Sequence, residues 1–122
     1  MKTYRMSRIN GEAIAHVEEN GIWEPLPFRL DLANHSPDGF EWGYQGSGPA
    51  QLALAILADL YQVPVRERRR TWLDETSIAE KFYQEFKTHF IAPAVDEDGW
   101  FIQEQEIREW ITAKLAEHIT HA

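Results

Sequence analysis

The sequence contains no cysteine, which excludes disulfide bonds, a thiolate nucleophile and a thiolate metal site. It also lacks a long apolar run, because the longest one, residues 52–58, falls far short of the ~20 residues that span a bilayer. The first residues, MKTYRMSRING, include no continuous apolar segment of the kind found in secretion signals. These absences predict a cytoplasmic protein that is neither inserted into a membrane nor secreted.

Positive charge is scarce as well. Lysine and arginine total 12 against 20 aspartates and glutamates, which gives a formal net charge of -8 and a pI near 5.0. On average such a chain repels nucleic acid and anionic lipid, so we expect no direct nucleic-acid partner and no membrane partner. The acidity could serve plain solubility, or it could imitate a polyanion that occupies the basic groove of a partner protein.

Large apolar side chains are abundant. Hydrophobic residues make up 43% of the chain and aromatic residues 12%, including five tryptophans and six phenylalanines. A chain of 122 residues with this composition can enclose one core but is too short for two independent ones. We therefore expect one domain that spans residues 1–122.

The first 32 residues are typical of short antiparallel strands. Alternating runs over residues 4–9 and 13–17 are each followed by an Asn-Gly dipeptide, which tolerates the positive φ of a tight hairpin turn. A third run opens at residue 22 and is interrupted by two prolines, as at a sheet edge. Residues 28–32 alternate again. The sequence therefore predicts a small antiparallel meander of three or four strands.

Three helices are predicted after these strands. The first has Pro49 at a first helical position and continues through a run that is apolar on nearly every side. The second covers about residues 75–90, and Ser77 with Glu80 would form its capping box. Residues 100–102 lead into the last helix. The predicted fold class is α+β, with a small N-terminal β-meander packed on about three α-helices.

A glycine-rich junction, FEWGYQGSGPAQLALAIL over residues 40–57, joins a long aromatic loop, residues 34–48, to the first predicted helix. Ser47 or Gly48 would cap that helix. The junction does not match a P-loop, because Pro49 and Ala50 stand where Lys and Ser or Thr are required. It also lacks the glycine spacing of dinucleotide-binding loops and of hydrolase elbows. No standard nucleotide or esterase motif is present.

General physics still favours an anion at this junction. Amides at the start of a helix lack partners and carry about half a positive charge, and nearby aromatic rings could stack on a planar base. The predicted binding residues for a phosphate-bearing small molecule are Trp42, Tyr44, Gly46, Ser47, Gly48, Ala50 and Gln51. The alternative is structural: the glycines only allow a tight turn, Trp42 belongs to the core, and Ser47 only caps the helix.

The run HSPDGFEWGYQGSGPAQLALAIL, residues 35–57, resembles the hallmark of a small uncharacterised domain family found in bacteria, their phages and mobile elements. The N-terminal β region and a later aromatic, helix-forming segment that ends near a W-x-I turn, here residues 100–102, also resemble that family. The family has no established activity. The resemblance implies a phage or mobile-element setting, and with it a counter-defence role such as trapping a nucleotide signal or blocking a host immune protein.

Other groups of functional residues carry less weight. An acid–base or nucleophile set could be built from four residues that also make a good turn: His35, Ser36, Asp38 and Glu41. The acidic run over residues 96–98 lacks the rest of a calcium loop. The arginine-rich run over residues 66–70 could grip phosphate or an acidic partner, or could be a solvated loop. We expect no catalytic residue, no metal and no cofactor.

The leading hypothesis is a non-enzymatic cytoplasmic domain that binds an anionic, nucleotide-like small molecule at the glycine-rich junction. The rival hypothesis is an acidic interaction module that blocks a partner such as a host defence protein. That module would act through the aromatic loop or through Glu104, Glu106 and Glu109 in the last helix. The sequence indicates no particular oligomeric state.

Overall fold

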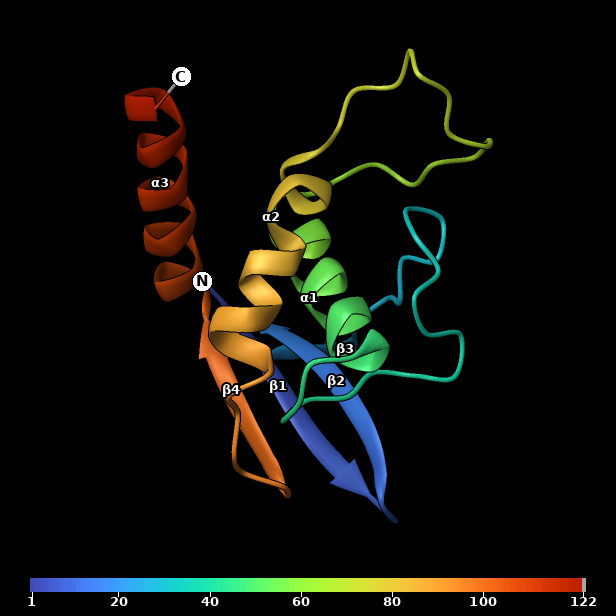
Figure 1. Cartoon of the computed structure of the whole chain (residues 1–122). Helices are drawn as coiled ribbons and strands as arrows, with labels where there is room; N and C mark the ends of the chain where they lie inside the picture. The colour runs from blue at the N-terminus through green and yellow to red at the C-terminus, as the bar shows by residue number, and fades with distance from the viewer. Residues whose placement is uncertain (122) are drawn as a thin grey trace.

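The computed structural model describes residues 1–121, with side chains through residue 119. Four antiparallel strands, β1 (Lys2–Ile9), β2 (Glu12–Glu19), β3 (Ile22–Pro25) and β4 (Gly99–Gln103), form one sheet in the order β3-β2-β1-β4. The helices are α1 (Ser47–Leu60), α2 (Ile78–Phe86), a π-helix η1 (Lys87–Ile91) and α3 (Glu104–His121). Figure 1 shows the helices gathered above and in front of the sheet. The predicted α+β class is confirmed.

Both predicted hairpin turns form. Asn10 and Gly11 have φ values of 52° and 80°, and Asn20 and Gly21 have 54° and 79°. These are the left-handed values that a two-residue type I′ turn requires. Because the first turn is tight, β1 and β2 pair along their whole length.

The fourth strand is not the one that the sequence predicts. Residues 28–32 form turns and irregular chain instead of a strand, and Arg29 takes a φ of 60°. Its guanidinium pairs with Asp31 and donates to the carbonyls of Val63 (2.8 Å) and Pro64 (2.9 Å), which ties this segment to the loop after α1. The fourth place in the sheet belongs to β4, from a segment predicted only to lead into the last helix.

α1 is the central helix. All residues from 48 to 58 are buried, as its apolar residues on every side predict. Its end is joined to the sheet, because the Tyr4 hydroxyl donates to Asp59 at 2.8 Å and Lys2 Nζ lies 3.1 Å from the same carboxylate. Burial, and the Asp59 charge beside it, raise the pKa of Tyr4. The hydroxyl therefore stays protonated and remains a donor.

The helix starts agree with the sequence in one case and differ in another. The Ser77 hydroxyl accepts from the Glu80 amide, and the Glu80 carboxylate accepts from the Ser77 amide, so the capping box is confirmed. The predicted cap of α1 at Ser47 or Gly48 is wrong. α1 begins after Gly46, whose backbone is extended, and no side chain caps it.

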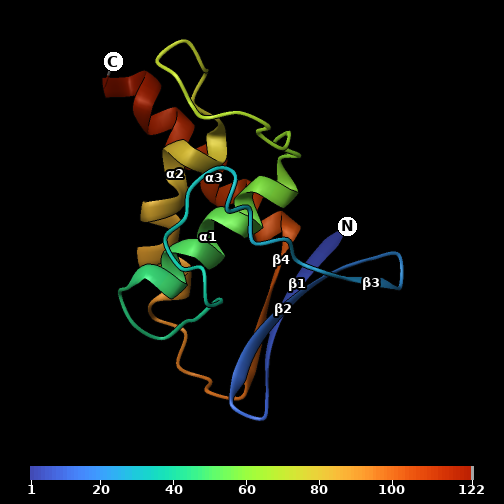
Figure 2. The same ribbon diagram turned by 90° about the vertical axis from the view of Figure 1, so that its right-hand side faces the viewer.

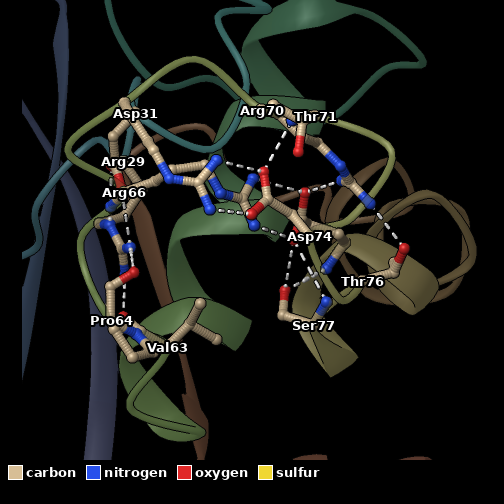
Figure 3. A network of polar contacts seen from close by, with 12 residues as sticks. Arg29, Asp31, Val63, Pro64, Arg66, Arg70, Thr71, Asp74, Thr76 and Ser77 are labelled. Carbon is tan, nitrogen blue, oxygen red and sulfur yellow. Dashed lines mark hydrogen bonds and ion pairs between the residues drawn. The ribbon is translucent and has the colours of Figure 1, made fainter.

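The arginine-rich loop between α1 and α2 is held by ion pairs. Arg66 makes two hydrogen bonds of 3.1 Å to Glu80, and Arg70 pairs with the same carboxylate. Arg68 pairs with Asp74 farther along the loop. Figure 3 shows contacts of this loop converging at the start of α2. Two carboxylates therefore pair with three arginines of this run, while residues 67–70 remain exposed to solvent.

The helices lie on one face of the sheet, and Figure 2 shows its other face without a covering helix. On that open face the Arg5 guanidinium lies 5.3 Å from the centre of the Trp23 ring and 5.0 Å from that of Phe101. The opposite face contributes Tyr4 and Met6 to the core. No helix within residues 1–121 is long and apolar enough to cross a membrane.

Candidate functional site

The aromatic loop borders a surface hollow of about 700 Å³. Three segments build it: the end of β1, the loop itself, and the residues that precede β4. The side chains that determine its chemistry are Arg8, Glu41, Trp42, Tyr44, Glu97 and Asp98. Trp42 and Tyr44 therefore line the same hollow, while their binding of a ligand stays a prediction.

Trp42 lines this hollow and also belongs to the hydrophobic core. Only 4% of it is exposed, its Nε1 donates to the Asp96 carbonyl at 2.9 Å, and its ring meets Trp100 edge-on at 6.3 Å between centroids. The Arg8 guanidinium lies 4.3 Å from the centre of the indole ring, a cation–π contact. Trp42 is thus a core residue that also presents a surface to the hollow.

Among the described residues, Arg8 is the only basic one that lines the hollow, and it is already paired. Its Nη2 and Nη1 donate to the Glu41 carboxylate at 2.7 and 3.2 Å, and its Nε donates to the Glu97 carbonyl at 2.9 Å. The hydrogen bond to Glu41 raises the pKa of Arg8 further above its usual value. Because Arg8 neutralises Glu41, the carboxylates of Glu97 and Asp98 leave the hollow with a negative charge.

Two of the three glycines of the junction, Gly46 and Gly48, are explained by close packing. A Cβ at Gly46 would lie 2.4 Å from the Tyr44 ring, and a Cβ at Gly48 would lie 2.7 Å from Cβ of Glu41. The absence of side chains therefore lets Tyr44 and Glu41 rest against the start of α1. Tyr44 remains 51% exposed at the rim of the hollow.

The donors at the start of α1 are fewer than the sequence predicts. The Ala50 amide donates to the Gly46 carbonyl at 3.0 Å, so it is not free, because α1 starts earlier than Pro49. Gln51 is the next residue and lies beyond the first four residues of α1, which are the ones whose amides can lack a partner within the helix. In the described part of the chain, only the amides of Ser47 and Gly48 at this end have no acceptor.

The Gln51 side chain points away from the hollow and is fully buried. Its Nε2 donates to the carbonyls of Phe28 (2.7 Å) and Ala33 (3.1 Å), and its Oε1 accepts from the amides of His35 (2.8 Å) and Ser36 (3.2 Å). The amide group therefore fastens the irregular segment of residues 28–36 to α1. A single glutamine in the otherwise apolar stretch of residues 48–58 was the signal for this role.

The acid–base or nucleophile set that could be built from residues 35–41 is not brought together. His35 Nε2 lies 2.8 Å from the Tyr83 hydroxyl, and the Ser36 hydroxyl donates to the Gly39 carbonyl, while Glu41 pairs with Arg8 at the hollow. The described residues contain no group of three or more acidic, histidine or cysteine side chains that could hold a metal ion. Sequence analysis missed Arg8, Glu97 and Asp98, since their meeting depends on the pairing of β1 with β4.

Comparison with known proteins identifies a family but no individual protein or structure that is similar. Searches of curated proteins and of solved structures found no significant match. A family model described as a family of unknown function, DUF6166, matches residues 4–113. That range runs from β1 into α3 and includes the hollow and every helix start. The chain therefore belongs to the DUF6166 family of unknown function.

Proposed function

We propose that this chain is a non-enzymatic, cytoplasmic interaction module whose hollow receives a basic side chain of a partner protein. The observation that supports this most is that the half-exposed Tyr44 lines the same hollow as Glu97 and Asp98, while Arg8 is already paired with Glu41. A guanidinium or ammonium group favours both an aromatic face and a carboxylate. The net charge of -8 attracts the same kind of partner over longer distances.

Arginine-containing peptides test this proposal. We expect an arginine–glycine repeat peptide to bind in calorimetric titration, and the Glu97→Gln/Asp98→Asn variant to bind it about tenfold more weakly, roughly 1.4 kcal/mol. Tyr44→Ala is expected to weaken binding about fivefold, because the cation–π contact is worth roughly 1 kcal/mol. Both effects should decrease as salt is added.

The matched control is Glu12→Gln/Glu75→Gln, which removes two exposed carboxylates that lie outside the hollow. If this control weakens the peptide as much as the variant at residues 97 and 98 does, attraction is only a consequence of net charge and the proposal fails. Tighter binding of nucleotides than of the peptide would also contradict it.

An anionic, nucleotide-like small molecule is the second candidate ligand. It is supported by the acceptor-free amides of Ser47 and Gly48, which lie close to the exposed ring of Tyr44. A base could stack on Tyr44 while its phosphate meets the two amides. Linear and cyclic nucleotides in the same titrations test it. A folded protein that binds none of them excludes this candidate.

The biological setting is part of the proposal too. The resemblance of residues 35–57 to a domain hallmark from bacteria, phages and mobile elements supports a counter-defence role, in which the module blocks a host defence protein. Neighbouring genes test the setting. Defence genes or mobile-element genes beside the coding sequence would support it, whereas a consistent metabolic neighbourhood would contradict it.

A further inference from the structure

β4 is an edge strand with an open side. It pairs with β1 and is the last strand of the sheet. The Arg8 amide donates to the Asp98 carbonyl at 3.2 Å, so residues 8 and 98 are a hydrogen-bonded pair of the antiparallel ladder. Hydrogen-bonded pairs alternate with non-hydrogen-bonded pairs along such a ladder. Trp100 and Ile102 therefore direct their backbone groups toward β1, and Phe101 directs its N–H and C=O outward.

This edge lacks two of the usual protections against a further strand. Within β4, the sequence GWFIQ includes neither proline nor a charged residue, whereas β3 at the opposite edge ends at Pro25. The Gly99 amide is occupied, because it donates to Asp96 Oδ1 at 3.3 Å. Phe101, the central residue of the strand, is 54% exposed.

An apolar groove of about 380 Å³ accompanies this edge. Phe90, Pro93, Val95, Trp100 and Ile102 line it. The indole Nε1 of Trp100 is buried and has no acceptor among the described residues. Buried donors of this kind are rare in folded proteins. Side chains of an added strand that lie opposite Trp100 and Ile102 would point to the same face as the groove.

The two ends of the groove carry negative charge. Asp96 lines it where β4 begins, with Glu97 and Asp98 next in the chain, and Glu106 lines it just after β4 ends. Arg5, a cation on the open face of the sheet close to Phe101, pairs with Glu18 at 3.6 Å. The groove is also lined by one histidine, His89. A second copy of this acidic chain would meet like charges at both ends, whereas a basic segment would meet opposite ones.

We infer that the β4 edge binds an extended segment of a partner protein as a fifth strand. Its alternate apolar side chains enter the groove, and its lysines or arginines at either end meet the acidic residues. The backbone of Phe101 supplies the central pair of hydrogen bonds. This inference rests on the proposed function for the basic character of the partner, and it adds a backbone contact that the hollow does not provide.

Peptides selected from a random-sequence library against the full chain provide the probe. We expect selected sequences to alternate apolar residues, to avoid proline between them and to carry basic ends. On binding, hydrogen exchange should slow at the amides of Phe101 and Gln103, which face outward, and change little at Trp100 and Ile102, which β1 already protects. This readout needs no variant. Failure to select any such peptide, or unchanged exchange at Phe101, would overturn the inference.

Two substitutions at one position give the matched comparison. Both Phe101→Val and Phe101→Pro remove the ring, but only proline removes the outward N–H, and neither breaks a bond to β1. We expect the proline variant to bind a selected peptide about tenfold more weakly than the valine variant, the factor for about 1.4 kcal/mol. Equal affinities would contradict a fifth strand. Far-UV circular dichroism of both variants checks that each is folded.

The outcomes separate the edge from the hollow. Slowed exchange at Phe101 together with no effect of Glu97→Gln/Asp98→Asn on the arginine peptide would support the edge and reject the proposed function. Peptide binding at the hollow without protection of Phe101 would do the reverse. Analytical ultracentrifugation tests whether a second copy of the chain occupies the edge instead. A dimer of the chain that Phe101→Pro dissociates would assign the edge to a second copy and overturn the inference.

Discussion

Replacing Gln51 by leucine is expected to lower the free energy of unfolding by about 3–5 kcal/mol, since each hydrogen bond that is lost contributes about 0.5–1.5 kcal/mol net. Leucine has a similar size and suits a helix, so neither volume nor helix propensity accounts for such a loss. The cause is the loss of all four hydrogen bonds from the side chain to residues 28–36. Urea denaturation monitored by tryptophan fluorescence measures it.

Gln84→Leu is the matched control, because Gln84 is an exposed helical glutamine. We expect it to change stability by less than about 0.5 kcal/mol. Hydrogen exchange adds a local readout, since the amides of His35 and Ser36 should lose protection in Gln51→Leu before the rest of the protein does. If Gln51→Leu were as stable as the control, the clamp between α1 and residues 28–36 would have no energetic importance.

The second large effect is expected at Glu80. Its side chain is only 8% exposed, and its carboxylate accepts from Arg66, Arg70 and the Ser77 amide. Glu80→Gln keeps the shape and removes the charge, so it leaves Arg66, itself 14% exposed, without its anion. Breaking a buried pair costs about 3–5 kcal/mol. Because Arg70 is partly exposed and solvent-screened, we expect a loss of about 2–4 kcal/mol.

The pH dependence of this loss has a definite sign. Burial opposes ionisation of Glu80, but hydrogen bonds from Arg66 and Ser77 outweigh it, and its pKa falls below the ordinary 4.5. A carboxylate with a lowered pKa stabilises the fold fully above its unfolded pKa and loses that contribution as the pH falls through its folded pKa. The stability difference between wild type and Glu80→Gln should therefore be constant near neutrality and narrow below pH 4.5.

Comparing the wild type with Glu80→Gln isolates the contribution of the Glu80 charge. Arg29 lowers the pKa of Asp31, which also loses its stabilising charge in acid, but this happens in both chains and cancels. Glu109→Gln serves as the control, because Glu109 is exposed on α3 and its carboxylate accepts a hydrogen bond from the neutral Gln105 side chain. We expect it to change stability by less than about 0.5 kcal/mol at any pH. A difference between wild type and Glu80→Gln that widens in acid would contradict the assigned role.

Sequence analysis succeeded where a feature depends on neighbouring residues. The Asn-Gly turns, the Ser77–Glu80 capping box and the buried α1 are each decided within a few positions of the chain. It failed where distant residues decide the structure. The strand predicted at residues 28–32 is absent because Arg29 bonds to carbonyls after α1 and Gln51 binds its backbone. β4 was missed because its partner, β1, lies about ninety residues earlier.

The candidate site shows the same division. Trp42 and Tyr44 were found from their spacing before the glycines, and they do line one hollow. The charge of that hollow could not be predicted, since Arg8, Glu97 and Asp98 reach it through the β1–β4 pairing. That charge is the reason why we propose a cation, instead of an anion, as the ligand of the hollow. The role of Gln51 changed for a similar reason, because its four partners lie 15 to 23 residues earlier in the chain.

The ion pairs within the chain have a consequence for the kinetics of association. Most of its 12 lysines and arginines, among them Lys2, Arg8, Arg66 and Lys114, face a carboxylate of the same chain. Little unshielded positive charge is left to interrupt the negative potential around the molecule. A positively charged protein would therefore be drawn toward it from many directions, and would collide productively more often in dilute salt than in concentrated salt.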